Sequence, residues 1–183
     1  YKEAFESSPR MVGGAIWDFV DQSLRANPAG NGIYKPAPFK GVTQAYGGMF
    51  GDRPNQANFC DNGIILGNRN TTAKTKEVKK VYQYMAFVRK DGSLTVLNKY
   101  FHKPLKGYAL YLVSLAPGGN HAVERMALPE IAPGKSVTVK LPSAAMQTGS
   151  LMVLADARFK LPEDVKELSA KQLEHVADEC EAY

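Results

Sequence analysis

The chain has 183 residues, about the length of one typical domain and below the size at which a single core must divide. Hydrophobic residues make up 44%, charged residues 22% and aromatic residues 10%, which excludes a wholly disordered chain. Lys and Arg number 23 against 18 Asp and Glu, and this formal charge of +5 is spread along the chain, which argues against a nucleic-acid partner. No run approaches the roughly 18 apolar residues of a membrane span, so no membrane partner is expected. Because the sequence starts at Tyr1, we expect a piece of a longer polypeptide and leave its compartment open.

The first apolar run is MVGGAIWDFVDQSL, at residues 11–24. A short run of this kind, with glycines near its start and polar residues at its end, predicts a buried strand. Residues 27–70 are dominated by Gly, Pro, Asn and Asp, which predicts long loops. Loops of that length are usually functional or belong to a larger assembly.

Short strands separated by turn signals are predicted after Thr71, at residues 81–89, 94–101, 108–115, 123–128, 136–141 and 150–159. The lysine cluster 74–80 is expected at the solvated start of the first strand. Asp91-Gly92 predicts a hairpin, and strict alternation over residues 136–141 predicts one buried and one wet face. Strands at this spacing indicate a β-sandwich. From Pro162 onward, first-turn acids and an imperfect apolar stripe predict a helix.

Few side chains stand out for chemistry. Cys60 and Cys180 lie far apart, without CxxC pairs or clustered histidines, so buried thiols are expected rather than a zinc site. The candidate carboxylates are Asp18, Asp21, Asp52 and Asp61. Aspartates near glycine and proline commonly anchor turns, and for the first three we favour that role over a glycosidase carboxylate pair. Trp17 suits either core packing or an apolar platform for a sugar ring, with its N–H as a donor.

Three ordered segments carry a family resemblance: GGAIWDFVDQSL at residues 13–24, YGGMFGD at 46–52 and NFCDNGI at 58–64. Three motifs of this length, in this order and spacing, are far more specific than one short pattern. They closely resemble the large β-galactosidases of glycoside hydrolase family 2. The resemblance continues through residues 76–159.

The resemblance implies a mainly β fold, an immunoglobulin-like β-sandwich preceded by a C-terminal segment of a (β/α)8 barrel. Residues 1–72 would be the barrel segment, with residues 13–23 as a late barrel strand that ends at the active-site face. Glu3 and Glu6 would then lie at the end of an outer barrel helix. Residues 73–183 would be the linking sandwich with a short helical C-terminal tail. Such a barrel takes about 250 residues, so this segment cannot close one by itself.

The resemblance also implies site residues. Trp17 and Asn62 are the candidate substrate-binding residues, and Trp17 matches the tryptophan that forms an apolar wall of the galactose pocket. Phe59 and Asn62 are the candidate metal ligands, since the backbone carbonyl of Phe59 and the amide oxygen of Asn62 match two sodium ligands. Hard cations favour oxygen, so the pair is chemically reasonable. It is incomplete, because the family's third ligand, an aspartate, matches a position far upstream.

In this family one glutamate attacks the anomeric carbon and a second acts as acid and then base, a retaining double displacement. Both glutamates and the magnesium ligands match positions before Tyr1, so no catalytic residue is assigned here. We therefore expect a parent β-galactosidase that cleaves terminal β-D-galactosyl residues with Mg and Na, and a chain that is inactive alone. Its expected partners are a β-galactoside and the remainder of the polypeptide, and the oligomeric state stays open, a homo-oligomer included.

Other functions stay open. The sandwich half would suit a non-catalytic carbohydrate-binding or structural module, although such a module has no evident need for residues 1–70. A nucleic-acid binder would show salt-dependent affinity, which we do not expect. Within the family, β-glucuronidases and β-mannosidases remain candidate relatives, and the YGGMFGD and NFCDNG segments favour galactosides.

Overall fold

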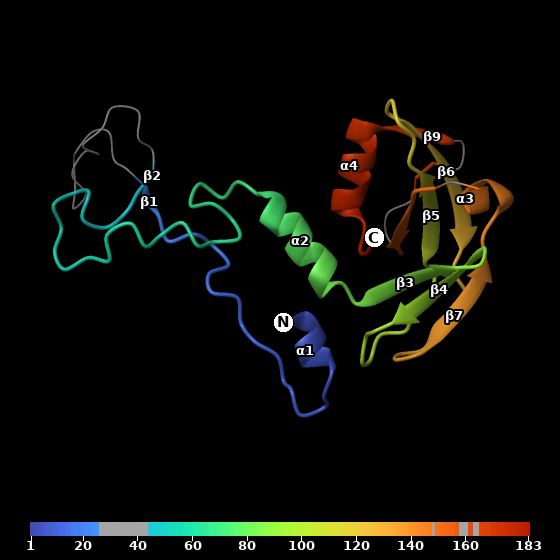
Figure 1. Ribbon diagram of the computed structural model, residues 1–183, viewed down its shortest axis with the longest axis horizontal. Helices are drawn as coiled ribbons and strands as arrows, with labels where there is room; N and C mark the ends of the chain where they lie inside the picture. The colour runs from blue at the N-terminus through green and yellow to red at the C-terminus, as the bar shows by residue number, and fades with distance from the viewer. Residues whose placement is uncertain (26–43, 148, 158–160, 163–164) are drawn as a thin grey trace. The chain divides into compact units, whose positions relative to one another are not determined.

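The computed structural model describes residues 1–25, 44–147, 149–157, 161–162 and 165–183. These residues form two compact units, Tyr1–Val81 and Tyr82–Tyr183. Figure 1 colours the first unit from blue to green and the second from green to red. The described part is mainly β, with short helices, as expected. Among its helices, none has the length and apolar character needed to cross a membrane.

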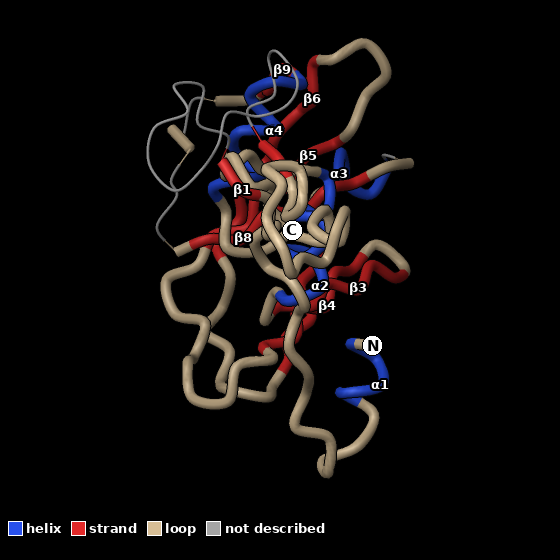
Figure 2. The backbone as a smooth tube through the Cα atoms, turned by 90° about the vertical axis from the view of Figure 1, so that its left-hand side faces the viewer, coloured by secondary structure: helices blue, strands red, loops and turns tan. Residues whose placement is uncertain are grey.

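The first unit consists largely of loops (Figure 2). Its regular elements are α1 (Lys2–Glu6), β1 (Leu24–Arg25), β2 (Gln44–Ala45) and α2 (Ala73–Tyr82), whose last residue belongs to the second unit. β1 pairs antiparallel with β2, and Leu24 and Met49 pack against the buried Ala45 and Phe50. A short helix is thus present at Glu3 and Glu6, as expected. Residues 26–43 of the expected long loop lie outside the described residues.

The buried strand predicted for residues 11–24 is wrong. Val12 and Trp17 are exposed, and in this stretch Val20 forms a bridge before β1 begins at Leu24. A parallel strand needs neighbouring strands that satisfy its backbone hydrogen bonds. Among the described residues, the segment next to it is the short stretch 60–65. The apolar run therefore indicated a strand, but the backbone of this segment is paired at too few residues to form one.

The lysine cluster lies in α2, so the prediction that it opens a strand is also wrong. Residues 73–82 (AKTKEVKKVY) contain no Gly or Pro, and six of the ten are Lys, Ala or Glu, which are strong helix formers. The following strand, β3 (Met85–Lys90), begins after Gln83, whose amide donates to the Met85 carbonyl at 3.0 Å. The domain boundary expected after residue 72 falls just before this helix and stays a prediction.

Two antiparallel sheets make up the second unit. One has the order β3, β4 (Ser93–Asn98), β7 (Ser136–Lys140). The other has the order β8 (Leu151–Asp156), β5 (Ala109–Ser114), β6 (Asn120–Ala127), β9 (Glu167–Ser169). One hydrophobic cluster takes buried side chains from both sheets, including Met85, Leu94, Val96, Leu110, Leu112 and Val153. The two sheets thus share one core, and the six strands predicted after Thr71 are confirmed in position to within a few residues.

β5 is buried on both faces. Leu110 and Leu112 belong to the core shared by the sheets, whereas Tyr111 and Val113 belong to a second cluster. The second cluster also contains residues of β9 and of α4 (Ala170–Glu179), namely Leu168, Leu173 and Val176. Successive side chains of a strand point to opposite faces, so a run that is apolar at both parities becomes the central strand between two apolar layers.

The turn chemistry predicted from the sequence is confirmed. Lys90 pairs with Ser93, and the two residues between them, Asp91 and Gly92, have φ values of 47° and 72°. Positive φ at both central positions is the mark of a type I′ turn, whose twist matches that of the flanking strands. On β7, the residues at 137 and 139 are partly buried against the core and their neighbours are exposed, which is the predicted alternation.

The last helix, α4, begins at Ala170 and not near Pro162 as predicted. The Ser169 hydroxyl accepts the N–H of Gln172 at 3.4 Å, and the Ser169 N–H donates to Gln172 Oε1 at 3.0 Å, which is a capping box. Leu168, just before the cap, pairs with His121 of β6 and so belongs to a strand. Residues 163–164 of the predicted start lie outside the described residues. A further short helix, α3 (Ser143–Gln147), buries Ala145 in the shared core.

A partly buried carboxylate fixes residues 181–183 to the rest of the second unit. Glu181 accepts hydrogen bonds from Tyr100 Oη at 2.5 Å, Lys103 Nζ at 2.7 Å and Tyr108 Oη at 2.7 Å. Burial by itself would raise the pKa of Glu181, but these three hydrogen bonds hold it below its usual value. Burial, followed by the hydrogen bond to the same carboxylate, raises the pKa of Tyr100 to about 12.

We expect Glu181→Gln to lower the free energy of unfolding of the chain by about 2 kcal/mol, because it removes the charge that strengthens three hydrogen bonds. The matched control is Glu130→Gln, whose partner Lys106 lies 4.0 Å away with both side chains mostly exposed, and which should change little. Urea denaturation followed by tyrosine circular dichroism measures both variants.

The hydrogen bonds to Glu181 also predict that the stability of the chain depends on pH. A lowered pKa in the folded state contributes stability above the unfolded-state pKa, and this contribution is lost as the pH falls through the folded pKa. The difference between wild type and Glu181→Gln should therefore be full at neutral pH and shrink below about pH 4. A difference that stays constant down to strong acid would contradict a role for the charge.

Candidate functional site

Two segments that carry the sequence motifs lie side by side in the first unit. Val20, from the motif at 13–24, forms a parallel bridge with Ile65, which follows the motif at 58–64. The Ile65 N–H donates to the Phe19 carbonyl at 2.9 Å, and the Asp21 N–H donates to the Ile65 carbonyl at 2.8 Å. One residue that donates to and accepts from residues on either side of its partner is the pattern of neighbouring parallel strands. The pairing brings the two motifs together.

Gly63 allows this close approach. A Cβ at position 63 would lie 2.2 Å from the backbone nitrogen of Asp21 and 2.7 Å from the carbonyl oxygen of Ile65. Neither atom belongs to a flexible side chain, so any side chain at 63 would push the two backbones apart. The next segment is tied to the same place, because the Thr72 hydroxyl donates to the Ile64 carbonyl at 3.1 Å.

The aromatic residues of the predicted site are exposed. Trp17 has 78% of its surface accessible and Phe59 has 62%. Among the described residues, Trp17 is therefore not part of a packed core, contrary to the core-packing alternative. A phenyl ring has no oxygen to offer a cation. The group that Phe59 would contribute is its backbone carbonyl. The substrate-binding role of Trp17 stays a prediction.

Asn62 carries an unusual oxygen. Its side-chain Oδ1 is buried and has no hydrogen-bond partner among the described residues. A buried polar atom without a partner costs about 1–3 kcal/mol, so such an atom is commonly satisfied by a water, an ion or a ligand. Asn62 Oδ1 and the carbonyl oxygen of Phe59 are two oxygen ligands of the kind that hard cations prefer. The residues present therefore fit part of the expected sodium site, which stays a prediction, as does contact of Asn62 with substrate.

Two of the candidate aspartates anchor loops, as favoured from the sequence. Asp52 Oδ1 accepts the Gly48 N–H at 2.8 Å, and the Asp52 carbonyl accepts the Asn55 amide at 2.7 Å. The Asp18 carboxylate accepts a hydrogen bond from the Gln22 side chain. The Asp52 contact joins a side chain to the backbone and the Asp18 contact joins two side chains, and both lie within four residues of the aspartate.

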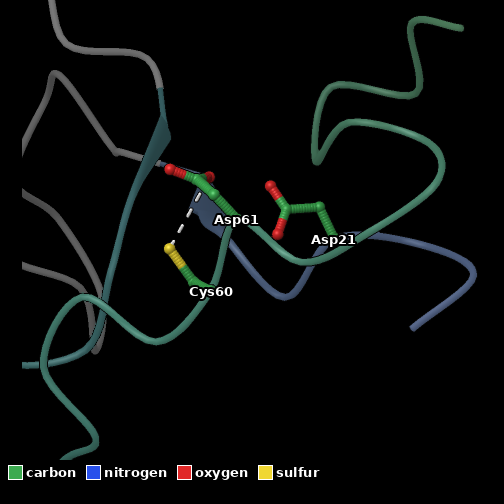
Figure 3. A group of neighbouring side chains, drawn as sticks. All are labelled: Asp21, Cys60 and Asp61. Atoms are coloured by element: carbon green, nitrogen blue, oxygen red, sulfur yellow. Dashed lines mark hydrogen bonds between the residues drawn. The ribbon is translucent and has the colours of Figure 1, made fainter. Parts of the chain in front are cut away.

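The third aspartate differs. Asp21 is only 7% exposed, and its Oδ1 has no hydrogen-bond partner among the described residues. Its carboxylate is turned toward Cys60 and Asp61 in Figure 3, and one ligand atom from each of these three residues lies within 4.8 Å of the others. The Cys60 thiol donates to Asp61 Oδ1 at 3.8 Å. Cys60 is buried, whereas Asp61 is exposed.

Electrostatics at this cluster disfavour negative charge. Burial, and then the hydrogen bond and charge of Asp61, raise the pKa of Asp21. Burial, and then the charges of Asp61 and Asp21, raise the pKa of the Cys60 thiol. Two carboxylates and a thiol at this spacing repel one another as anions, so a proton or a cation must offset the charge.

Sequence reasoning missed this cluster. Loop anchoring was favoured for Asp21, and Cys60 was expected to be an isolated buried thiol. Cys60 is buried as expected, but Asp21, which comes from a segment far away in sequence, lies close to it. The signal that could have found the cluster is the barrel resemblance itself. Successive strands of a (β/α)8 barrel are parallel neighbours, which would place the ends of residues 13–23 and of the NFCDNG segment side by side.

Comparison with known proteins agrees with the motifs. Residues 1–87 match the family model described as glycosyl hydrolases family 2, TIM barrel domain. The chain is 39% identical to a β-galactosidase of Priestia megaterium over 111 residues, which is 59% of this chain. It is 32% identical to a β-galactosidase of Oenococcus oeni over 159 residues, or 83% of this chain, and 32% identical to one of Streptococcus thermophilus over 133 residues, or 73%.

The matched region is a small part of each relative. It covers 10% of the Priestia megaterium protein, 14% of the Oenococcus oeni protein and 12% of the Streptococcus thermophilus protein. The chain therefore spans only a fraction of the length of these relatives. The resemblance predicted from the three motifs is confirmed: residues 1–87 match the barrel domain of glycosyl hydrolase family 2, and the chain is similar to a segment of the β-galactosidases.

Proposed function

We propose that this chain is the part of a β-galactosidase that supplies the last strands of the catalytic barrel and the domain that follows. The observation that carries the proposal is the parallel bridge of Val20 with Ile65, with the helix α2 beginning eight residues later at Ala73. In a (β/α)8 barrel each strand lies parallel to its neighbours and is followed by a helix, and this parallel bridge with a helix after it is consistent with that plan. In such barrels the ends of the strands and the loops after them form the active-site face, where Trp17 and Asn62 would lie.

The second unit is proposed to be an immunoglobulin-like sandwich. Its antiparallel sheets share one core, and residues 181–183 add a bridge to β8 through Ala155 and Ala182. One sheet has the order β3-β4-β7, and the other has the order β8-β5-β6-β9, in which β5 and β6 are the central strands. A three-strand and a four-strand sheet of this kind match the general plan of such sandwiches.

In the proposed enzyme, the chain binds and orients the sugar but does not attack it. The two glutamates of the retaining mechanism would come from the rest of the polypeptide. The exposed indole of Trp17 would cover the apolar C–H face of the galactosyl ring. The Phe59 carbonyl and Asn62 Oδ1 would hold sodium, which supplies a fixed positive charge for sugar hydroxyls, and magnesium would bind elsewhere in the enzyme.

Hydrolysis of a chromogenic β-galactoside tests the proposal. We compare the chain alone with a chimera in which it replaces the matching segment of the Priestia megaterium β-galactosidase. Activity is expected in the chimera and absent from the chain alone. Trp17→Ala in the chimera should lower kcat/KM at least about tenfold, because the platform for the sugar is lost. Phe101→Ala, which removes an 82% exposed ring in the second unit, is the matched control and should not change it.

The other outcomes separate the rival functions. Activity of the chain alone would make Asp21 and Asp61 the carboxylate pair to test by Asp21→Asn, since their oxygens lie within 4.8 Å. A folded chimera without activity would overturn the galactosidase proposal. That result would favour the alternative function, a non-catalytic carbohydrate-binding or structural module.

A further inference from the structure

The cluster of Asp21, Cys60 and Asp61 has the features of a cation site. Asp21 is more than nine-tenths buried, and its unpartnered Oδ1 belongs to a carboxylate aimed at the other two side chains (Figure 3). A buried oxygen acceptor without a donor is costly to leave unsatisfied. A cation placed between the three side chains would satisfy this oxygen and offset the repulsion between the carboxylates.

The spacing suits a small metal ion. One atom from each residue lies within 4.8 Å of the others, and Cys60 Sγ lies 3.8 Å from Asp61 Oδ1. Zinc–sulfur and zinc–oxygen bonds of about 2.3 and 2.0 Å at a tetrahedral angle place the two ligand atoms about 3.5 Å apart. The thiol and the Asp61 carboxylate are thus almost at ligand spacing, and a carboxylate oxygen of Asp21 lies within 4.8 Å of both ligand atoms.

The backbone holds the two sides of the cluster together. The Gln22 N–H donates to the Cys60 carbonyl at 3.3 Å, and the Asp21 N–H donates to the Ile65 carbonyl at 2.8 Å. Asp21 and Cys60 each carry one of the proposed ligand atoms. The backbone pairing that joins the two motifs therefore holds both residues in place. Ligands positioned in advance lose little further freedom when an ion binds.

Ligand chemistry selects the ion. A thiolate is a soft ligand that favours zinc over sodium or magnesium, which prefer oxygen. Three protein ligands leave a fourth position for water, and the exposed side of Asp61 leaves room for it. We propose that Asp21, Cys60 and Asp61 form a binding site for a thiophilic divalent cation of the zinc type. On binding, the Cys60 thiol releases its proton to solvent and the thiolate sulfur bonds the metal.

This site uses different atoms from the proposed sodium site, which consists of the Phe59 carbonyl and Asn62 Oδ1. It goes beyond the proposed galactosidase function and does not depend on it. Competition between ions distinguishes the two sites: a zinc ion held by a thiolate should resist a large excess of sodium, whereas an ion held by oxygens alone should not.

The test uses the full chain freed of metal with a chelator. Zinc chloride is titrated in by calorimetry, and cadmium chloride serves as the spectroscopic probe, because a cadmium–thiolate bond adds an ultraviolet charge-transfer band. We expect one zinc per chain, retention of zinc in excess sodium chloride, and a cadmium band. Cys60→Ala should abolish the band, and both Cys60→Ala and Asp21→Asn should weaken zinc binding at least about 100-fold.

Cys180→Ser is the matched control, because Cys180 is also buried and donates to the carbonyls of Ala177 and Ala182, contacts that a hydroxyl can keep. It should bind zinc like the wild type. A second readout needs no variant: zinc should slow the alkylation of Cys60 by iodoacetamide, measured by peptide mass spectrometry, without slowing that of Cys180. Absence of saturable zinc binding, displacement by sodium, wild-type affinity in Cys60→Ala, or alkylation of Cys60 unchanged by zinc would each overturn the proposal.

Discussion

Replacing Asn98 by alanine should lower the free energy of unfolding of the chain by about 3 kcal/mol, because three backbone groups each lose a hydrogen bond to one fully buried side chain. Asn98 is fully buried at the end of β4. Its Nδ2 donates to the carbonyls of Lys103 at 2.9 Å and Ile131 at 3.0 Å, and its Oδ1 accepts the Tyr100 N–H at 2.9 Å. These contacts join the end of β4 to the segments at 100–103 and at Ile131, and the Ile131 carbonyl also accepts the Leu105 N–H at 2.9 Å.

The estimate follows from the cost of leaving each group unpaired. A buried donor or acceptor that loses its partner costs about 1–3 kcal/mol, and losses that share one cavity do not add fully. Asn98→Asp separates hydrogen bonding from packing. The aspartate has the same shape and still accepts from Tyr100, but its carboxylate cannot donate and would face two carbonyl oxygens. We expect it to destabilise the chain at least as much as alanine does.

Urea denaturation followed by near-ultraviolet circular dichroism of the tyrosines reports on the second unit. Asn120→Ala, at an exposed position of β6, is the matched control and should change the free energy of unfolding by less than about 0.5 kcal/mol. If Asn98→Asp kept wild-type stability, the side chain would be acting through its volume and not through its hydrogen bonds.

Local sequence signals predicted the second unit well because its strands are set by contacts near in sequence. The turn at Asp91 and Gly92 fixes the register of β3 against β4, since only Lys90 and Ser93 can pair across it. β5 is apolar at both parities, and the structure places it between two apolar clusters. The start of β3 was missed because the lysines were assigned to the strand that follows them, while a run free of Gly and Pro favoured a helix.

The first unit could not be predicted by the same signals. Residues 11–24 carry the apolar run of a barrel strand, but a parallel strand is completed by neighbours that are distant in sequence. The cluster of Asp21, Cys60 and Asp61 could not be predicted for the same reason, because it depends on contacts between segments distant in sequence. Asp21 and Cys60 are each unremarkable in sequence, and they meet only because the backbones of residues 18–22 and 60–65 are paired. The family motifs indicated both segments and their roles, but not which side chains of the two would face each other.

Gly63→Ala should separate the two motif segments. The new Cβ would lie 2.2 Å from the Asp21 nitrogen and 2.5 Å from its Cα, and neither backbone atom can move without breaking the Asp21 to Ile65 hydrogen bond. We expect the amides of Asp21, Ile64 and Ile65 to exchange with solvent deuterium at least about 100-fold faster, equivalent to about 2.7 kcal/mol of lost local stability. Hydrogen exchange read by NMR measures each amide separately.

The fluorescence of Trp17, the single tryptophan of the chain, gives a second readout of the same segment. Gly149→Ala is the matched control, because a Cβ there meets nothing within 4 Å, and it should leave both signals unchanged. The variant also connects the two proposals made for this unit. Since the pairing holds Asp21 next to Cys60, Gly63→Ala should weaken zinc binding along with amide protection. Amide protection that survives the substitution would mean that the two segments are not joined as described, and the proposed barrel position would lose the observation that carries it.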